Sequence, residues 1–170
     1  MTISVGDTMP KGQFTRMGAN GPEPVSTDDL FLGKKVVLFS VPGAFTPTCS
    51  ARHLPGFIGN YDQLKAKGVD TIACMAVNDV FVMKAWGESS KAAGKVEMLA
   101  DGNGEYARAL GLELDASKFG MGTRSKRFSM IVQDGVVKSL NIEPPGEFGA
   151  SSAEAALKQD RKSTRLNSSH

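Results

Sequence analysis

Long apolar runs along the chain predict the strands of a sheet. Residues 35–41 and 69–77 are nearly unbroken apolar and β-branched runs, a pattern typical of strands buried on both faces. A shorter run predicts a third strand over residues 96–100. Residues 127–132 and 136–142 predict two further strands, joined as a hairpin through a Gln-Asp-Gly sequence.

Helical spacing of apolar residues separates these strands. Pro47 suits the first position of a helix, and Pro55 inside the same pattern predicts a kink because proline removes a backbone donor. Asn78 is placed as the N-cap of the next helix, and residues 105–110 predict a short helix that Gly111 ends. Apolar residues at helical spacing mark the first two helices: Leu54, Phe57, Ile58, Tyr61 and Leu64, then Phe81, Val82, Ala85 and Trp86.

Small polar residues predict helix caps near both ends of the chain. Ser26 or Thr27 is placed to cap a short helix in the N-terminal region. Ser151 or Ser152 is placed to cap a last helix over residues 153–158. No internal repeat and no linker interrupts the series of elements.

The order of these elements predicts the fold class. Strands that alternate with helices and end in a hairpin are typical of a three-layer α/β domain, in which helices cover both faces of a mixed sheet. Residues 1–33 are rich in glycine and proline, which predicts turns and short edge strands ahead of this core. We therefore expect residues 1–159 to form a single domain.

Composition excludes several classes of protein. Of the 170 residues, 41% are apolar and 22% are charged, which is ordinary for a globular protein and argues against disorder. No apolar run approaches the roughly 20 residues that cross a bilayer, and the first residues show no secretory signal. Two cysteines do not make a disulfide scaffold in a chain of this length. We therefore expect a soluble cytoplasmic protein.

Residues 160–170 differ in character from the rest. They form a polar string without apolar periodicity, and they resemble the translation of a sequencing adapter joined to a truncated transcript. A native disordered basic tail is the alternative interpretation. Without this tail, residues 1–159 hold 17 basic and 17 acidic residues, so nothing indicates nucleic acid or a membrane as a partner.

Cys49 follows the first buried strand, at the predicted start of a helix. In open α/β sheets, ligands bind beyond the carboxyl ends of the strands, where helices begin. The unpaired N–H groups of a first helical turn stabilise an anion there. The thiolate is the reactive form of cysteine, yet only about 3% of an unperturbed thiol is ionised at pH 7. Position alone therefore indicates either a reactive cysteine or a small buried residue without chemical use.

The residues around Cys49 carry a family resemblance. Pro42, Thr46 and Cys49 fit the pattern Pro-x-x-x-Thr-x-x-Cys, within the longer run Pro-Gly-Ala-Phe-Thr-Pro-Thr-Cys-Ser. This run resembles the peroxidatic loop of peroxiredoxins, in the type II or five-like branch. The resemblance extends over nearly all of residues 2–159, through further stretches at residues 53–57, 77–79, 81–86, 99–101 and 126–135. It implies a thioredoxin-like fold with extra N-terminal strands.

The resemblance also implies a thiol peroxidase whose nucleophile is Cys49. Its thiolate would attack one peroxide oxygen, become a sulfenic acid and expel water or an alcohol. Thr46 would present its hydroxyl to the thiolate and the peroxide. Arg127 would supply a planar cation, a role for which Arg124 is the nearest rival. Pro42 would shield the sulfur from water.

His53 lies four residues after Cys49, a spacing that allows both to share one helix face. A cysteine–histidine pair indicates a thiol hydrolase as an alternative, although no third orienting group is identifiable. The peroxiredoxin pattern places His53 at the pocket, together with Phe45 and Phe119. Cys49, Cys74 and His53 lack the clustering of metal ligands, so we expect neither a metal nor a cofactor.

Cys74 lies 25 residues after Cys49, inside the second buried strand. In plant-like type II relatives, a cysteine at this spacing can resolve the sulfenic acid as an intramolecular disulfide. That bond needs Cα atoms within about 7 Å, which calls for local unwinding of the helix start. Cys74 is either this resolving cysteine or a buried structural thiol, in which case an external thiol attacks Cys49. The animal arrangement has no counterpart here, because residues 149–152 contain no cysteine.

The leading functional hypothesis is an antioxidant peroxidase that reduces hydrogen peroxide and organic hydroperoxides. Glutaredoxin with glutathione, or thioredoxin, would be its reductant. The alternative is a non-enzymatic redox sensor, in which oxidised Cys49 passes its oxidation to a partner protein. Both begin with the same sulfenic acid, so the sequence does not separate them. The resemblance further implies a homodimer with the active-site loop near the interface.

Overall fold

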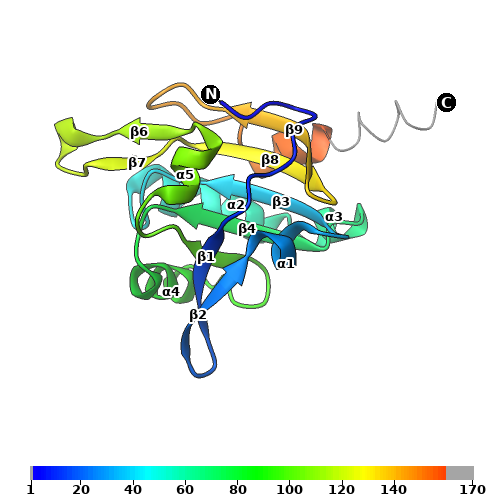
Figure 1. Cartoon of the computed structure of the whole chain (residues 1–170), viewed down its shortest axis with the longest axis horizontal. Helices are drawn as coiled ribbons and strands as arrows, with labels where there is room; N and C mark the ends of the chain where they lie inside the picture. The colour runs from blue at the N-terminus through cyan, green and yellow to red at the C-terminus, as the bar shows by residue number, and fades with distance from the viewer. Residues whose placement is uncertain (1, 160–170) are drawn as a thin grey trace.

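The computed structural model describes residues 2–159, and the predicted foreign tail at residues 160–170 lies outside them. Figure 1 shows a central sheet with helices on both sides and a small hairpin projecting at one end. The strands are β1 (Gln13–Gly18), β2 (Gly21–Ser26), β3 (Lys35–Ser40), β4 (Thr71–Ala76), β5 (Glu97–Ala100), β6 (Glu113–Asp115), β7 (Thr123–Ser125), β8 (Phe128–Gln133) and β9 (Val136–Ile142). The helical segments are α1 (Thr27–Phe31), η1 (Cys49–His53), α2 (Leu54–Gly59), α3 (Tyr61–Ala66), α4 (Val80–Ser89), α5 (Glu105–Leu110), η2 (Ser117–Phe119) and a last helix over residues 153–159.

Seven strands of the described region form one sheet in the order β2-β1-β5-β4-β3-β8-β9. The central strands β3, β4 and β5 run parallel, while the flanking strands pair antiparallel, so the sheet is mixed. The predicted short N-terminal strands are β1 and β2, which form one edge. The strongest apolar runs, β3 and β4, thus lie at the centre, where both strand faces are covered.

Alternating side chains of the central strands build a separate core on each face of the sheet. Phe39 and Cys74 are paired in register and belong to the core beneath η1, α2, α4 and residues 153–159. Leu38 and Met75 belong to the opposite core, beneath α1 and α5. The predicted three-layer α/β/α architecture is therefore confirmed. No helix of residues 2–159 combines the length and the hydropathy needed to span a bilayer.

Several predicted helix ends are confirmed by their hydrogen bonds. Ser26 Oγ accepts the Asp29 N–H at the start of α1. Ser152 Oγ accepts the Ala155 N–H at the start of the last helix. Gly111 ends α5 with φ 73°, a left-handed conformation that glycine adopts without steric cost.

The predicted N-cap of α4 is wrong by one residue. Asp79 Oδ1 accepts the Val82 N–H at 2.9 Å, so Asp79 is the cap. Asn78 Oδ1 instead accepts the Ala44 N–H, also at 2.9 Å, in the loop that follows β3. Both residue types cap helices well, so the local pattern does not choose between these neighbours.

The irregularity expected at Pro55 takes the form of a π-helical turn that ends just before it. In this turn, η1, the Leu54 N–H donates to the Cys49 carbonyl. Pro55 has no N–H with which to continue the α-helical pattern, which favours a wider turn ahead of it.

The hairpin of β6 and β7 had no sequence prediction, because three-residue strands offer too little apolar alternation to detect.

Candidate active site

Cys49 lies in the first helical turn after β3. Pro47 is the first helical residue, as predicted, and Cys49 is the third. The Ser50 N–H donates to the Thr46 carbonyl at 2.9 Å and closes this first turn. The Cys49 side chain is fully buried. The sulfur is therefore enclosed at the start of the helix rather than open to solvent.

The guanidinium of Arg127 reaches this sulfur from a distant part of the chain. Arg127 Nη2 donates to Cys49 Sγ at 3.0 Å. Arg127 directly precedes β8, whose Phe128 pairs with Ser40 at the end of β3. The antiparallel register of β3 and β8 therefore places the cation beside the loop that leads to Cys49. A cation beside a cysteine sulfur stabilises the thiolate over the thiol.

The rival cation, Arg124, is bound elsewhere. Its Nε donates to the Met121 carbonyl and its Nη1 to the Val77 carbonyl, both at 2.9 Å. These bonds tie the segment ahead of β7 to the end of β4. The geometry therefore places Arg127 at the sulfur and gives Arg124 a structural position.

His53 is buried and neutral behind Arg127. Its Nδ1 lies 2.9 Å from Arg127 Nη1, and its Nε2 lies 3.0 Å from the Ser151 carbonyl oxygen. Because a guanidinium only donates and a carbonyl only accepts, the ring proton is assigned to Nε2. Burial, reinforced by the positive charge of Arg127, lowers the pKa of His53 to about 3. This geometry does not support a hydrolase, because the free lone pair of His53 faces Arg127 rather than the Cys49 thiol.

Thr46 does not form the predicted contact with the sulfur. Its Oγ1 donates to the Gly43 carbonyl at 2.7 Å, and within residues 2–159 no hydrogen bond joins it to Cys49. The Thr46 N–H also points to that carbonyl, at 3.4 Å, because the chain turns back between the two residues. The hydroxyl oxygen keeps lone pairs with which it can accept a hydrogen bond from a substrate.

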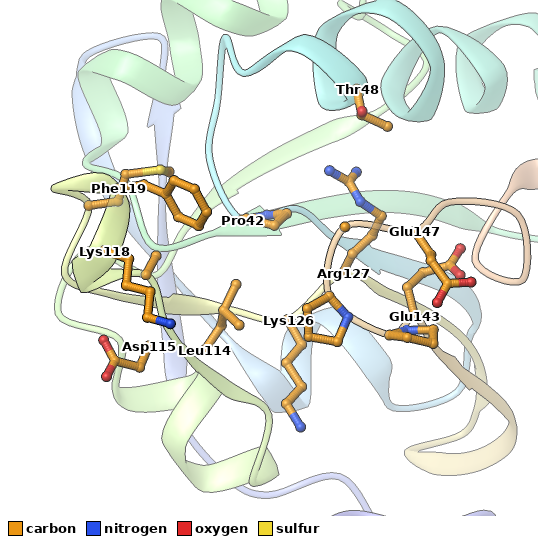
Figure 2. Close-up of a pocket in the computed structure, with 15 residues that line it drawn as sticks. Pro42, Thr48, Leu114, Asp115, Lys118, Phe119, Lys126, Arg127, Glu143 and Glu147 are labelled. Carbon is orange, nitrogen blue, oxygen red and sulfur yellow. The ribbon is translucent and has the colours of Figure 1, made fainter.

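A cavity of about 550 Å³ opens beside Arg127. Pro42, Thr48 and Phe119 line it, together with Arg127 itself. Figure 2 shows Phe119 and Arg127 on opposite sides of this pocket, with Pro42 between them. Cys49 is not exposed to the cavity, but its chain neighbour Thr48 and its hydrogen-bond donor Arg127 both are. The cavity therefore adjoins the residues that contact Cys49, and Pro42 and Phe119 line its wall.

Two further residues expected at the pocket lie outside its lining. Phe45 is 53% exposed and adopts a left-handed backbone with φ 64°, which reverses the loop and leaves the ring in solvent. His53 is completely buried, and it meets the pocket only through Arg127. Phe45 and His53 therefore do not line this cavity, although His53 contacts Arg127 beside the sulfur.

Comparisons with known proteins agree with this fold. Residues 4–157 match the family model described as Redoxin. The chain is 54% identical over 157 residues to Peroxiredoxin-2C of Oryza sativa subsp. japonica, covering 92% of this chain and 97% of the relative. It is 50% identical, with the same coverage, to Peroxiredoxin-2D of Arabidopsis thaliana. A crystal structure of reduced Prx3 from Vibrio vulnificus in complex with H2O2 is 52% identical, with a TM-score of 0.90, and covers 94% of this chain and 99% of that one.

The chain belongs to the type II peroxiredoxins. This peroxiredoxin is accordingly an antioxidant thiol peroxidase, and its mixed sheet with helices on both faces is the expected thioredoxin-like fold.

Cys74 of this peroxiredoxin is a buried thiol in β4. It is fully buried and pairs in register with Phe39 of β3. Burial raises the pKa of Cys74 well above its ordinary value, and the neighbouring Cys49 raises it further. Both cysteines are free. In this folded state Cys74 is therefore protonated and a poor nucleophile.

Two polar residues that support the site of the peroxiredoxin were not predicted from its sequence. Asn78 holds the backbone of Ala44, in the loop between β3 and Cys49. Glu143 accepts hydrogen bonds from residues 149–151, the segment whose carbonyl contacts His53. Asn78 lies 34 residues from Ala44, whereas Glu143 lies 6 and 8 residues from Gly149 and Ser151. The sequence feature that could have pointed to Glu143 is its position as an acidic residue directly after the apolar strand β9.

Proposed function

We propose that Cys49 is the peroxidatic cysteine of this peroxidase. Its thiolate attacks one oxygen of a hydroperoxide, an S–O bond forms, and the O–O bond breaks with its electron pair on the departing oxygen. One proton converts that oxygen into water or an alcohol, and Cys49 is left as a sulfenic acid. The observation that carries this assignment is the 3.0 Å contact between Arg127 Nη2 and Cys49 Sγ.

Arg127 and Thr46 are proposed to stabilise the reacting atoms. Charge builds on the departing oxygen as the O–O bond breaks, and a fixed cation beside the sulfur stabilises that charge. A guanidinium offers several N–H donors in a fixed planar fork, which suits this role. Thr46 lies one turn before the sulfur and is proposed to accept a hydrogen bond from the peroxide. Pro42, in the pocket wall, is proposed to keep water from the sulfur.

An external thiol is proposed to complete the cycle. The thiol condenses with the sulfenic acid to form a mixed disulfide and water, and a second thiol reduces that disulfide and restores Cys49. Glutathione with glutaredoxin, or thioredoxin, supplies these two thiols. The burial and protonation of Cys74, which make it a poor nucleophile, support this route over an internal disulfide.

A homodimer and a cytoplasmic location complete the proposal. Exposed aromatic side chains are the proposed contacts of the dimer: Phe45, Phe81 and Phe119 are 53%, 65% and 81% exposed. Analytical ultracentrifugation tests it: the wild type is expected as a dimer and a Phe81→Asp, Phe119→Asp double variant as a monomer. A monomeric wild type contradicts the dimer.

The cytoplasmic location rests on the sequence expectation, and imaging of a fluorescent fusion in the native cell tests it.

The deciding experiment measures steady-state hydroperoxide consumption with glutathione and glutaredoxin, and separately with thioredoxin and its reductase. Wild type and Cys74→Ser are expected to turn over with at least one reductant, and Cys49→Ser with neither. Full activity in Cys49→Ser contradicts the catalytic assignment, and loss of turnover in Cys74→Ser assigns the resolving role to Cys74. A single oxidation of wild type without turnover under both systems would favour the redox sensor.

A further inference from the structure

A buried carboxylate closes the loop that lies behind the catalytic cation. Glu143 directly follows β9 and is only 6% exposed. Its Oε2 accepts the N–H groups of Gly149 and Ser151 at 2.7 and 2.8 Å, and the Ser151 hydroxyl at 2.7 Å. Burial raises the pKa of Glu143, but the hydrogen bonds from Ser151 and Gly149 lower it by more, so the group remains ionised.

The closed loop contacts both residues that stand behind the sulfur. The Ser151 carbonyl lies 3.0 Å from His53 Nε2. The Phe148 ring packs edge-on against His53, with centroids 5.0 Å apart, and the Arg127 guanidinium lies 6.0 Å from the same ring. Figure 2 shows Glu143 on this loop beside Arg127, at the pocket. One segment thus supports the histidine and the guanidinium together.

We propose that Glu143 is a positioning residue for the peroxidase reaction, acting through Ser151, His53 and Arg127 on Cys49. The Ser151 carbonyl accepts the His53 Nε2 proton, which leaves Nδ1 as the acceptor for Arg127 Nη1. With Nη1 bound to His53, Nη2 is directed at the sulfur. If Glu143 releases the loop, the His53 proton is free to move to Nδ1, where it would meet the donor Nη1. The guanidinium would then lose the partner that orients it.

This proposal rests on the proposed function, because it requires Cys49 to be the reacting residue. It predicts that the Glu143 carboxylate influences a reaction it does not touch. Glu147 provides a matched control, since it is an exposed carboxylate on the same loop and lines the same pocket. No hydrogen bond to the Glu147 side chain is formed within residues 2–159.

The test compares Glu143→Ala, Glu143→Gln and Glu147→Ala in the full chain. The measured quantities are the rate constant of Cys49 oxidation by hydrogen peroxide in stopped flow and the His53 tautomer in long-range ¹H–¹⁵N spectra. Glu143→Ala is expected to slow oxidation about tenfold and to shift His53 away from the Nε2–H tautomer. Glu143→Gln keeps an oxygen acceptor and is expected to restore most of the rate. Glu147→Ala also removes a carboxylate from the pocket wall but leaves the hydrogen bonds of the loop in place, so it is expected to keep the wild-type His53 tautomer.

Each outcome decides the proposal. A folded Glu143→Ala variant with the rate and tautomer of Glu147→Ala overturns it, even if its stability is lower, because Glu143 then only closes the loop. If Glu143→Ala does not fold, the wild-type spectrum decides: a His53 proton on Nδ1 overturns the proposal, and a proton on Nε2 together with a Glu143→Gln rate near wild type supports it. A Cys49→Ser variant with full activity would instead refute the proposed function itself.

Discussion

The indole N–H of Trp86 donates to Ser50 Oγ at 3.0 Å, so the single tryptophan of the chain is bound to the residue that follows Cys49. Trp86 belongs to α4 and is 1% exposed. Ser50 belongs to the π-helical turn η1. The bond therefore ties the turn that carries Cys49 to the neighbouring helix, across the core.

Trp86 emission is expected to report the recycling step. Cys49 is fully buried, so an external thiol reaches its sulfur only if η1 moves, and that movement breaks the Trp86–Ser50 bond. Hydrogen peroxide followed by glutathione should therefore shift Trp86 emission to longer wavelength, and excess thiol should reverse the shift. Cys49→Ser should show no shift. Unchanged emission in a wild type that mass spectrometry shows to be glutathionylated would mean that η1 stays in place.

Arg127 and Arg124 allow a matched test of the proposed role of the cation at Cys49. Arg127→Ala removes the donor to Cys49 Sγ and is expected to slow Cys49 oxidation about 100-fold. Arg127→Lys should recover only part of this rate, because an ammonium lacks the fork that serves His53 and Cys49 together.

Arg124→Ala should instead lower the free energy of unfolding by about 1–2 kcal/mol, because two carbonyls lose their donor. Its oxidation rate should stay within a few-fold of wild type. Stopped-flow oxidation and urea denaturation check both variants. A larger loss of rate in Arg124→Ala than in Arg127→Ala would show that the cation is assigned to the wrong residue.

The sequence predicted the elements of the fold better than the contacts between them. The strands β3 and β4 were predictable because a continuous apolar run has few alternatives to a buried central strand. The contact between Cys49 and Arg127 joins residues 78 apart, so no local periodicity encodes it. Its prediction rested on the resemblance to the peroxiredoxin motif alone. The bond from His53 Nε2 to the Ser151 carbonyl, by contrast, has no motif, and only the three-dimensional structure shows it.

The neighbours Asn78 and Asp79 show where local rules fail. Both are good N-caps, and only the position of the loop after β3 decides that Asp79 caps α4 while Asn78 turns to Ala44. The Ala44 N–H, which is distant in sequence, competes with the start of α4 for the Asn78 side chain. Capping propensities describe only the start of the helix, so they do not reveal this second donor.

The same pair gives a prediction that separates activity from stability. Asn78→Ala leaves the Ala44 N–H without its acceptor and loosens the loop ahead of Cys49, so Cys49 oxidation is expected to slow about tenfold. Asp79→Ala removes the cap of α4 and is expected to lower the free energy of unfolding by about 1 kcal/mol, with little change in rate. Stopped-flow oxidation and urea denaturation of both variants test the contrast. Equal oxidation rates in the two variants would argue against a role for Asn78 in shaping the loop.

The buried neutral His53 makes stability depend on pH. Its pKa is about 3 in the folded protein against an ordinary value of 6.5, so between these limits the unfolded chain binds the extra proton. The unfolding free energy therefore falls as pH falls through this window, by about 2 kcal/mol between pH 7 and pH 5.

The window from pH 7 to pH 5 isolates this titration. His53 is the only histidine of residues 2–159, and Glu143, whose folded pKa is lowered, contributes only below its ordinary value of 4.5. Urea denaturation at pH 7, 6 and 5 measures the slope, and His53→Asn should flatten it because it removes the titrating ring. A slope that survives in His53→Asn would assign the proton uptake to other groups and show that His53 is not held neutral behind Arg127.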